Sequence, residues 1–176
     1  MKNSINRSKP RGLPATLFLL AALVVLLVTA SPARCAEQPE QDAAYHNQVG
    51  LEYFNKGFYD HTPKLQVQEG GHQYRAAEDA FKRAIAADPS YVDAHRNLAR
   101  LYHVQKNFPG AADEYKKVTE LAPSDVDAYV NLALAHVASG RYDAAVEALE
   151  TAKSHTTDPK ARETLNRYID NVHKQR

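Results

Sequence analysis

Histidine is the residue type in this chain that most readily suggests chemistry, because eight histidines occur among its 176 residues. An imidazole binds metal ions and transfers protons near neutral pH. His95 and His103 are eight residues apart, too far along one helix to share an ion without a third ligand, and none is evident. His61 and His72 lack carboxylate or cysteine residues at metal-ligand spacing. We therefore expect no metal site.

Other signatures of catalysis or cofactor binding are also missing from the sequence. It has no Gly-rich phosphate loop, no serine nucleophile elbow and no convincing pairing of a nucleophile with a base. The single cysteine, Cys35, excludes an intramolecular disulfide and a cysteine-based metal site. We expect a protein that is not an enzyme and has no catalytic residues and no cofactor.

Small, aromatic and proline residues recur at an interval of 34 positions through the middle of the chain. The positions in register are Ala77, Ala111 and Ala145; Phe81, Tyr115 and Leu149; Asn97 and Asn131; Leu98 and Leu132; Ala99 and Ala133; and Pro89 and Pro123. A period of about 34 that carries such residues indicates a helical solenoid. Helices pack closely where small side chains let their backbones approach. Ala99 with Ala111, and Ala133 with Ala145, are placed to make these close contacts.

The recurring residues resemble the tetratricopeptide repeat, in which an aromatic-x2-Leu-small-x2-aromatic helix is followed by Ala-x3-aromatic and a closing proline. The pattern covers residues 95–123 and 129–159, where the closing proline arrives two residues late, and in split form 46–53 and 77–89. The resemblance implies an all-α fold. It predicts an α-solenoid of three tetratricopeptide helix pairs plus a C-terminal capping helix.

The resemblance also predicts how the chain is divided. We expect one repeat domain over 43–176, with repeat 1 at about 43–91, repeat 2 at 92–125, repeat 3 at 126–159 and the capping helix at 159–174. Repeat 1 carries 31 residues from His46 to Ala77, against 16 from His95 to Ala111 in repeat 2. We therefore expect an inserted loop over 60–72. Such insertions often lie on the binding face, although a tolerated loop without a function is the alternative.

Helix ends are expected from caps and turns. Serine precedes a carboxylate by three residues at Ser90 and Asp93, and again at Ser124 and Asp127, which is the capping-box spacing. The expected helices cover about 43–57, 73–87, 91–106, 125–139 and 158–173. Gly140 supplies the turn before the last repeat helix, and Lys106 takes the matching place one repeat earlier.

Residues 1–35 form a separate segment. A basic head of four Lys and Arg residues precedes an unbroken apolar run over 17–28. Twelve apolar residues, or sixteen with their flanks, suit a signal peptide better than a membrane span, which needs about 20. We predict a signal peptide over 1–35, or alternatively a signal anchor, and a polar linker over 36–42. Both predict an exported protein of the bacterial periplasm or cell envelope, either soluble after cleavage or tethered to the membrane by this segment.

The charge of the exported part limits its partners. Five of the 22 basic residues and none of the 21 acidic residues lie in the first 35 positions, which leaves 17 basic residues against 21 acidic ones, a net charge near −4. A mildly acidic solenoid without a basic run argues against nucleic acid or an anionic membrane surface as the partner. The remaining length is enough for one domain with a core.

By the resemblance, the first helix of each pair lines a concave groove, to which Phe54 and Asn55 also belong. The candidate partner-binding residues are Asn47, Leu51, Arg96, Asn97, Arg100, His103, Asn131, Leu134 and Val137. Family members use an asparagine at the positions of Asn97 and Asn131 to hold a peptide backbone, because an amide both donates and accepts hydrogen bonds; helix packing is the alternative role. Arg96 and Arg100 lie one turn apart and can pair with a partner carboxylate. The alternative is that they pair with Asp93 or are simply solvated.

These observations predict a non-catalytic protein–protein interaction adaptor or scaffold of the cell envelope, which binds a segment of another protein in the groove. One family subgroup clamps the acidic tails of chaperones, and Asp127 would repel such a tail. The alternative function is a structural subunit that self-associates through its terminal repeat faces or the 60–72 loop, and the sequence leaves the oligomeric state open. His95 and His136 take places where the repeat packs an aromatic residue, so we expect partly buried packing groups there.

Overall fold

The computed structural model describes residues 42–59 and 67–176, and every regular element within these ranges is a helix. The helices are α2 (Ala43–Tyr59), α3 (Val67–Ala87), α4 (Val92–Val104), α5 (Phe108–Leu121), α6 (Val126–Ala138), α7 (Tyr142–His155) and α8 (Pro159–Gln175). The predicted all-α fold is confirmed.

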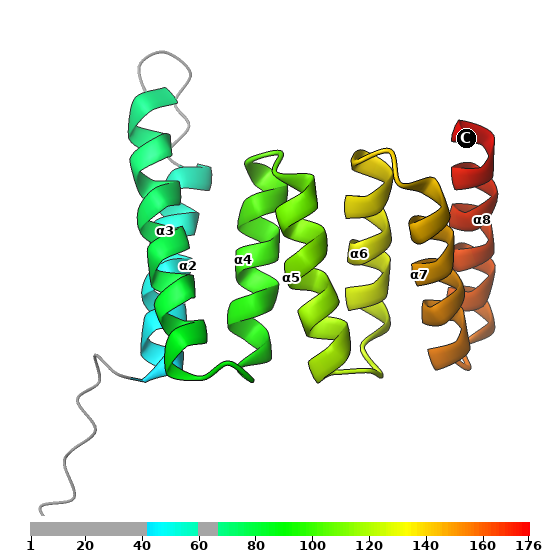
Figure 1. The fold of residues 1–176 in the computed structure, drawn as a ribbon, viewed down its shortest axis with the longest axis horizontal. Coiled ribbons are helices and arrows are strands. Elements are labelled where there is room, and N and C mark those ends of the chain that lie inside the picture. Colours follow the sequence, from blue (N-terminus) through cyan, green and yellow to red (C-terminus); the bar gives the residue numbers. More distant parts are fainter. Residues whose placement is uncertain (1–41, 60–66) are drawn as a thin grey trace, which may run out of the picture. The chain divides into compact units, whose positions relative to one another are not determined.

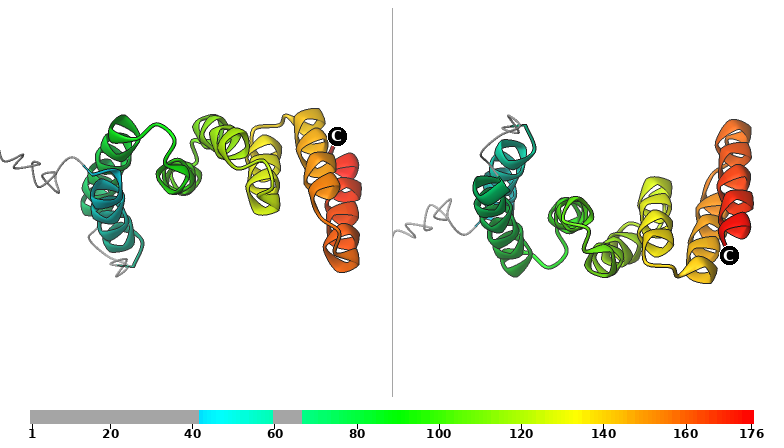
Figure 2. Two further views of the ribbon diagram at one scale, coloured as in Figure 1. Left: turned by 90° about the horizontal axis from the view of Figure 1, so that it is seen from below. Right: turned by 90° about the horizontal axis from the view of Figure 1, so that it is seen from above.

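The described residues, 42–59 and 67–176, form a row of helices that run in alternating directions, each packed against the next (Figure 1). Along this row, α2, α4 and α6 lie on one side, whereas α3, α5 and α7 lie on the other (Figure 2). α2 also contacts α4 directly. The helices therefore form three successive pairs, followed by α8 at the end of the row, which is the predicted solenoid.

The alanines in register are buried where neighbouring helices meet. Ala99, Ala111, Ala133 and Ala145 belong to one core cluster, and none of them is more than 1% exposed. Backbones that lack bulky side chains between them can approach closely, and the larger residues then fill the space beside them. The predicted small-residue contacts between helices are confirmed.

The last helix closes this core. α8 buries an apolar stripe of Leu165, Ile169 and Val172 against the alanine-rich cluster. Its other side chains are mostly polar and exposed. Asp158 caps the helix by accepting hydrogen bonds from the backbone N–H groups of Lys160 and Ala161. A helix with one apolar face is how a repeat array ends without exposing its core.

A second core cluster holds the N-terminal helix pair against α4. Its buried members are Phe54, Ala77, Phe81, Leu98 and Leu101. Tyr102 packs against this cluster and also against the larger alanine-rich one. The ring of Tyr102 therefore lies where the two halves of the core meet.

The first helix pair differs from its predicted boundaries. α2 continues to Tyr59, two residues past the predicted end, and α3 begins at Val67, so that residues 67–72 of the predicted loop are helical. Residues 60–66 lie outside the described part of the chain. Gly57 does not end α2: a Cβ atom there would come within 2.8 Å of the Tyr74 ring. This glycine allows α2 and α3 to approach each other.

The predicted serine caps are each wrong by one position. Ser90 does not cap α4, because its backbone N–H and its hydroxyl both donate to Asp88 Oδ1, at 2.9 Å and 2.6 Å. The N-cap residue is Tyr91, which makes no side-chain cap hydrogen bond. In the next repeat Asp125, and not Ser124, caps its helix by accepting from the Ala128 N–H at 3.0 Å. A carboxylate competes well for an N-terminal amide, because it is charged.

The turns before α5 and α7 share one backbone conformation, 34 residues apart. Lys106 has a φ of 60° and Gly140 a φ of 71°. A left-handed residue other than glycine is strained by roughly 1–2 kcal/mol. A Cβ at Gly140 would meet no atom within 4 Å, so that only the backbone conformation opposes a side chain there.

We therefore expect opposite effects from two substitutions. Gly140→Ala should lower the free energy of unfolding by about 1 kcal/mol, and Lys106→Gly should raise it by somewhat less than about 1 kcal/mol, because glycine also gains freedom in the unfolded chain. Urea titration followed by circular dichroism measures both. Equal changes of the same sign would contradict the shared turn conformation.

None of the helices in 42–59 or 67–176 is both long enough and apolar enough to cross a membrane. The apolar run over 17–28 is not among these residues, and the same holds for the rest of the predicted signal segment and nearly all of the predicted linker.

Candidate functional site

A surface depression of about 330 Å³ is lined mainly by side chains of α2, α4 and α6, the helices that share one side of the row. Its apolar lining consists of Phe54, Phe58, Tyr59, Val104 and Leu134. Its polar lining consists of Asn55, Arg100, His103, Tyr115 and Asn131. We call this depression the aromatic pocket. It spans the first helices of all three pairs, which are the helices that the sequence predicted to line a groove.

Large apolar side chains at the aromatic pocket remain open to solvent. Phe58 is 49% exposed, Tyr59 is 77% exposed and Leu134 is 49% exposed. The ring of Phe58 stacks on Phe54, with centroids 6.0 Å apart, and meets Tyr59 edge-on at 5.2 Å. Gathered apolar side chains that stay exposed in one depression are typical of a surface that a partner covers.

The pocket is cationic. None of its ten lining residues is an Asp or Glu, whereas Arg100 and His103 are among them. The guanidinium carbon of Arg100 lies 6.0 Å from the centre of the Phe54 ring, and Arg100 forms no ion pair within the described residues. Burial raises the pKa of the Tyr115 hydroxyl, although the positive charges of Arg100 and Arg96 act in the opposite direction. The phenol therefore stays neutral and can donate a hydrogen bond.

Four of the nine predicted site residues line this pocket: Arg100, His103, Asn131 and Leu134. Phe54 and Asn55, which the sequence also placed in the groove, are there as well. Asp127, Asn131 and Leu134 follow one another at helical spacing on α6, so that Asp127 lies one turn beyond the pocket on the same helix face. The other five predicted residues have contacts within the chain.

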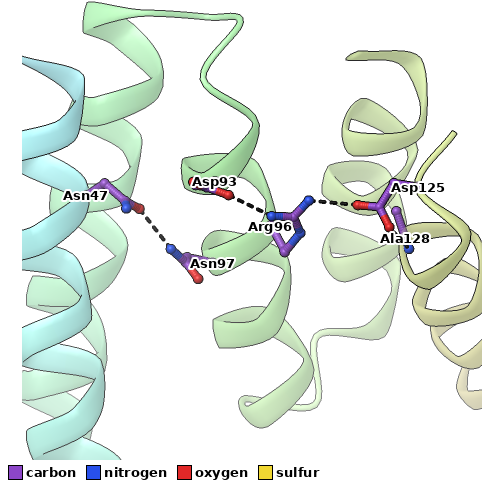
Figure 3. A network of polar contacts seen from close by, with 6 residues as sticks. All are labelled: Asn47, Asp93, Arg96, Asn97, Asp125 and Ala128. Carbon is purple, nitrogen blue, oxygen red and sulfur yellow. Dashed lines mark hydrogen bonds and ion pairs between the residues drawn. The ribbon is translucent and has the colours of Figure 1, made fainter. Parts of the chain in front are cut away.

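Two of these five, Asn47 and Asn97, bind each other. The Asn97 amide Nδ2 donates to Asn47 Oδ1 at 2.9 Å, which joins α2 to α4 (Figure 3). Asn47 is only 7% exposed. One of the two amide N–H groups of Asn97 is therefore used inside the protein, and a role in holding a partner backbone stays a prediction.

Arg96 joins α4 to the start of α6. Its guanidinium donates to Asp93 Oδ1 at 2.6 Å and to Asp125 Oδ2 at 2.7 Å (Figure 3). The other oxygen of Asp125 caps α6. With two carboxylates around its guanidinium, Arg96 is poorly placed to bind a third from a partner, unlike Arg100.

Leu51 and Val137 are half-buried. Leu51 packs against the core cluster of the N-terminal helix pair, and Val137 packs against the alanine-rich cluster. Both contribute to the fold, and their contact with a partner also stays a prediction.

His95 and His136 are at least partly buried within the fold. His95 is 6% exposed, with Nδ1 2.7 Å from Glu114 Oε2 and Nε2 3.1 Å from the Pro89 carbonyl oxygen. Burial lowers the pKa of His136, and Arg141 lowers it further. Both are packing groups, as predicted. No group of three or more His, Cys, Asp or Glu side chains in the described ranges is arranged to hold a metal ion.

Phe58 and Tyr59 were not among the predicted groove residues, although they form much of the apolar lining of the aromatic pocket. Ending the first helix at Gly57 placed both residues in the expected loop. The signal that identifies Phe58 is its spacing, because Leu51, Phe54 and Phe58 follow one another at steps of three and four residues on one face of α2.

Sequence and structure comparisons give the chain's relatives. Two family models described as Tetratricopeptide repeat match residues 66–126 and 105–168. The comparison with curated proteins gave no match.

Three solved structures illustrate the shared fold. The first is the TPR2B domain of yeast Sti1 in its pHsp70 complex (TM-score 0.59, 23% identity, 76% of this chain and 98% of that one). The second is the second TPR domain of human RPAP3 with an HSP70 peptide (0.56, 18%, 74% and 98%), and the third is MamA (0.54, 25%, 66% and 55%). The two sequence matches together span residues 66–168, more than half of the chain, and with this fold they show that the chain belongs to the tetratricopeptide repeat family.

Proposed function

We propose that this protein is a non-catalytic adaptor that binds a segment of a partner protein across α2, α4 and α6, and that it acts outside the cytoplasm at the cell envelope. The observation that carries the binding role is the aromatic pocket. It combines exposed Phe58, Tyr59 and Leu134 side chains with the guanidinium of Arg100. Aromatic and Arg side chains in a central depression are the groups that contribute most to protein–protein affinity.

The comparisons support the same class of function. The Sti1 and RPAP3 domains have the same fold and are seen in complexes with peptides of other proteins. An acidic tail is a poor ligand for this groove as a whole. Asp127 is exposed on the groove side of α6 and would repel an acidic tail bound along its full length.

The binding role can be tested with a photocrosslinking amino acid in the full chain, in the cells that produce it. Leu134 lies in the aromatic pocket, and Leu121 on α5 is a similarly exposed leucine outside it, at 39% against 49%. We expect a crosslinked partner at position 134 that is absent at 121. The same adducts at both positions would contradict a groove function. An adduct with twice the mass of the chain would instead favour the self-associating subunit.

The proposed location follows from the basic head and the apolar run over 17–28. The intact mass of the protein purified from its own cells tests it. A mass lower by the leader indicates a cleaved signal peptide, and the full mass in the membrane fraction indicates an anchor. The full mass in the soluble cytoplasmic fraction would refute export.

A further inference from the structure

The two ends of the groove differ in charge. Among the described residues, the lining of the aromatic pocket includes the Arg100 guanidinium and no carboxylate. Toward the start of α4 and α6, Asp93 and Asp125 both bind Arg96, and Asp127, the second residue of α6, is an exposed carboxylate. The groove is therefore positive at one end and negative at the other.

The exposed apolar side chains of the aromatic pocket lie at one end of the groove. Phe58, Tyr59 and Leu134 belong to the aromatic pocket, whereas Asp93 and Asp127 are exposed polar residues. Asp127 and Leu134 are seven positions apart on α6, which corresponds to about 10 Å along the helix axis. An extended chain covers this distance with about three residues. A partner segment of ordinary length can therefore reach both ends.

From this arrangement we infer the chemistry of the partner segment: it carries a large apolar side chain next to a carboxylate, which bind the aromatic pocket and Arg100, and a basic side chain on one side of that anchor, which binds Asp127. This inference rests on the proposed function and deepens it. Matching the two charges fixes the direction of the segment in the groove, because the reverse direction places like charges together.

Two features make Arg100 the residue that selects the carboxylate. Arg96, one turn earlier, already binds two aspartates at 2.6 Å and 2.7 Å, whereas Arg100 has no ion pair with the side chains described in 42–59 and 71–176. Arg100 is also exposed, and its guanidinium carbon lies 6.0 Å from the centre of the Phe54 ring, beside the apolar side chains of the pocket. A partner carboxylate that binds there forms a charge-assisted hydrogen bond.

The test uses the protein purified from the cells that produce it. A display library of random dodecapeptides is selected for binding to this protein. For the unchanged protein we expect enriched peptides with Phe, Leu or Trp next to Asp or Glu, and with Lys or Arg on one side only. Arg100→Glu should abolish the acidic preference, Asp127→Asn the basic one, and Leu134→Ser the apolar one. Lys116→Glu changes an exposed cation on α5 outside the pocket and should leave all three preferences unchanged.

The best peptide then gives the affinity by fluorescence anisotropy. Arg100→Glu should weaken its binding about tenfold or more, with circular dichroism unchanged, and Lys116→Glu should not. Enrichment that ignores Arg100 and Asp127, or no enrichment at all, would overturn the inference. The crosslink at position 134 depends on neither result, so a partner crosslinked there with a neutral or basic segment would refute the inferred chemistry and leave the adaptor function standing.

Discussion

Replacing Gly50 with alanine is expected to lower the free energy of unfolding by about 3 kcal/mol, the upper end of the usual cost of overpacking a core. A Cβ atom at Gly50 would lie 2.5 Å from both Cδ1 and Cε1 of Phe81. Phe81 is 0% exposed, so its ring has no free space into which to move. The melting temperature should fall by on the order of 10 °C for a domain of this size.

The matched control is Gly71→Ala in α3, where the nearest atom to a new Cβ is Arg75 Nη2 at 4.0 Å. Alanine is favoured over glycine in an open helical position by up to about 1 kcal/mol, so this variant should be slightly stabilised. Thermal and urea unfolding measure both variants.

A second substitution tests the cause of the Gly50 effect. Phe81→Leu removes the ring atoms that the new methyl group would meet, so Gly50→Ala should cost much less in that background than in the unchanged protein. If Gly50→Ala were neutral or stabilising, as expected for Gly71→Ala, the close packing of α2 on α3 would be wrong.

Gly50 also shows why the fold was predictable from sequence. It occupies the small-residue place in the first unit that Ala99 and Ala133 occupy in the next two, and all three residues are buried. A period that repeats small residues next to large ones reports directly on helix packing, because the same interface recurs in every unit. The solenoid was predicted from that period, whereas the capping helix was predicted from the family resemblance.

Glycine and serine misled the prediction where one residue type has two roles. Gly57 suggested a helix end but lies within α2 to admit the Tyr74 ring, which is a contact across helices that no local pattern encodes. Ser90 has the spacing of a cap, yet its backbone N–H and its hydroxyl both donate to Asp88 instead. Local competition of this kind is decided by small energies, and helix ends are accordingly harder to predict than helices.

Only part of the candidate site was predicted, because residues far apart in the sequence decide which polar groups already have a partner. The structure brings Arg100, Asn131 and Leu134 together in the aromatic pocket. The resemblance to the family is what placed them in the groove, since it gives the helix face on which each side chain lies. It does not tell whether a polar group on that face already has a partner. Asn97 finds Asn47 fifty residues earlier in the chain, and only the packing of α2 on α4 brings them together.

Tyr102→Ala is expected to lower the free energy of unfolding by about 2–3 kcal/mol, somewhat less than the roughly 3–5 kcal/mol typical of a fully buried aromatic residue, because Tyr102 is only half-buried. Its ring packs against both core clusters, and its hydroxyl donates to Glu78 Oε1 on α3 at 3.2 Å. Burial raises the pKa of this hydroxyl, so it stays neutral and keeps its proton to donate. The variant loses packing on both sides at once.

The larger consequence concerns cooperativity. Each repeat contacts only its neighbours, so that the stability of a solenoid is shared through the interfaces between units. Without the Tyr102 ring, we expect α2 and α3 to open separately from α5 to α8, which hydrogen exchange would show as a loss of amide protection in α2 and α3 well beyond that in α7 and α8. Tyr102→Phe keeps the ring and removes one hydrogen bond, so it should cost only about 0.5–1.5 kcal/mol and leave the exchange pattern even along the chain. A uniform loss of protection in Tyr102→Ala would mean that Leu98 and Leu101 on α4 join the two clusters without the tyrosine.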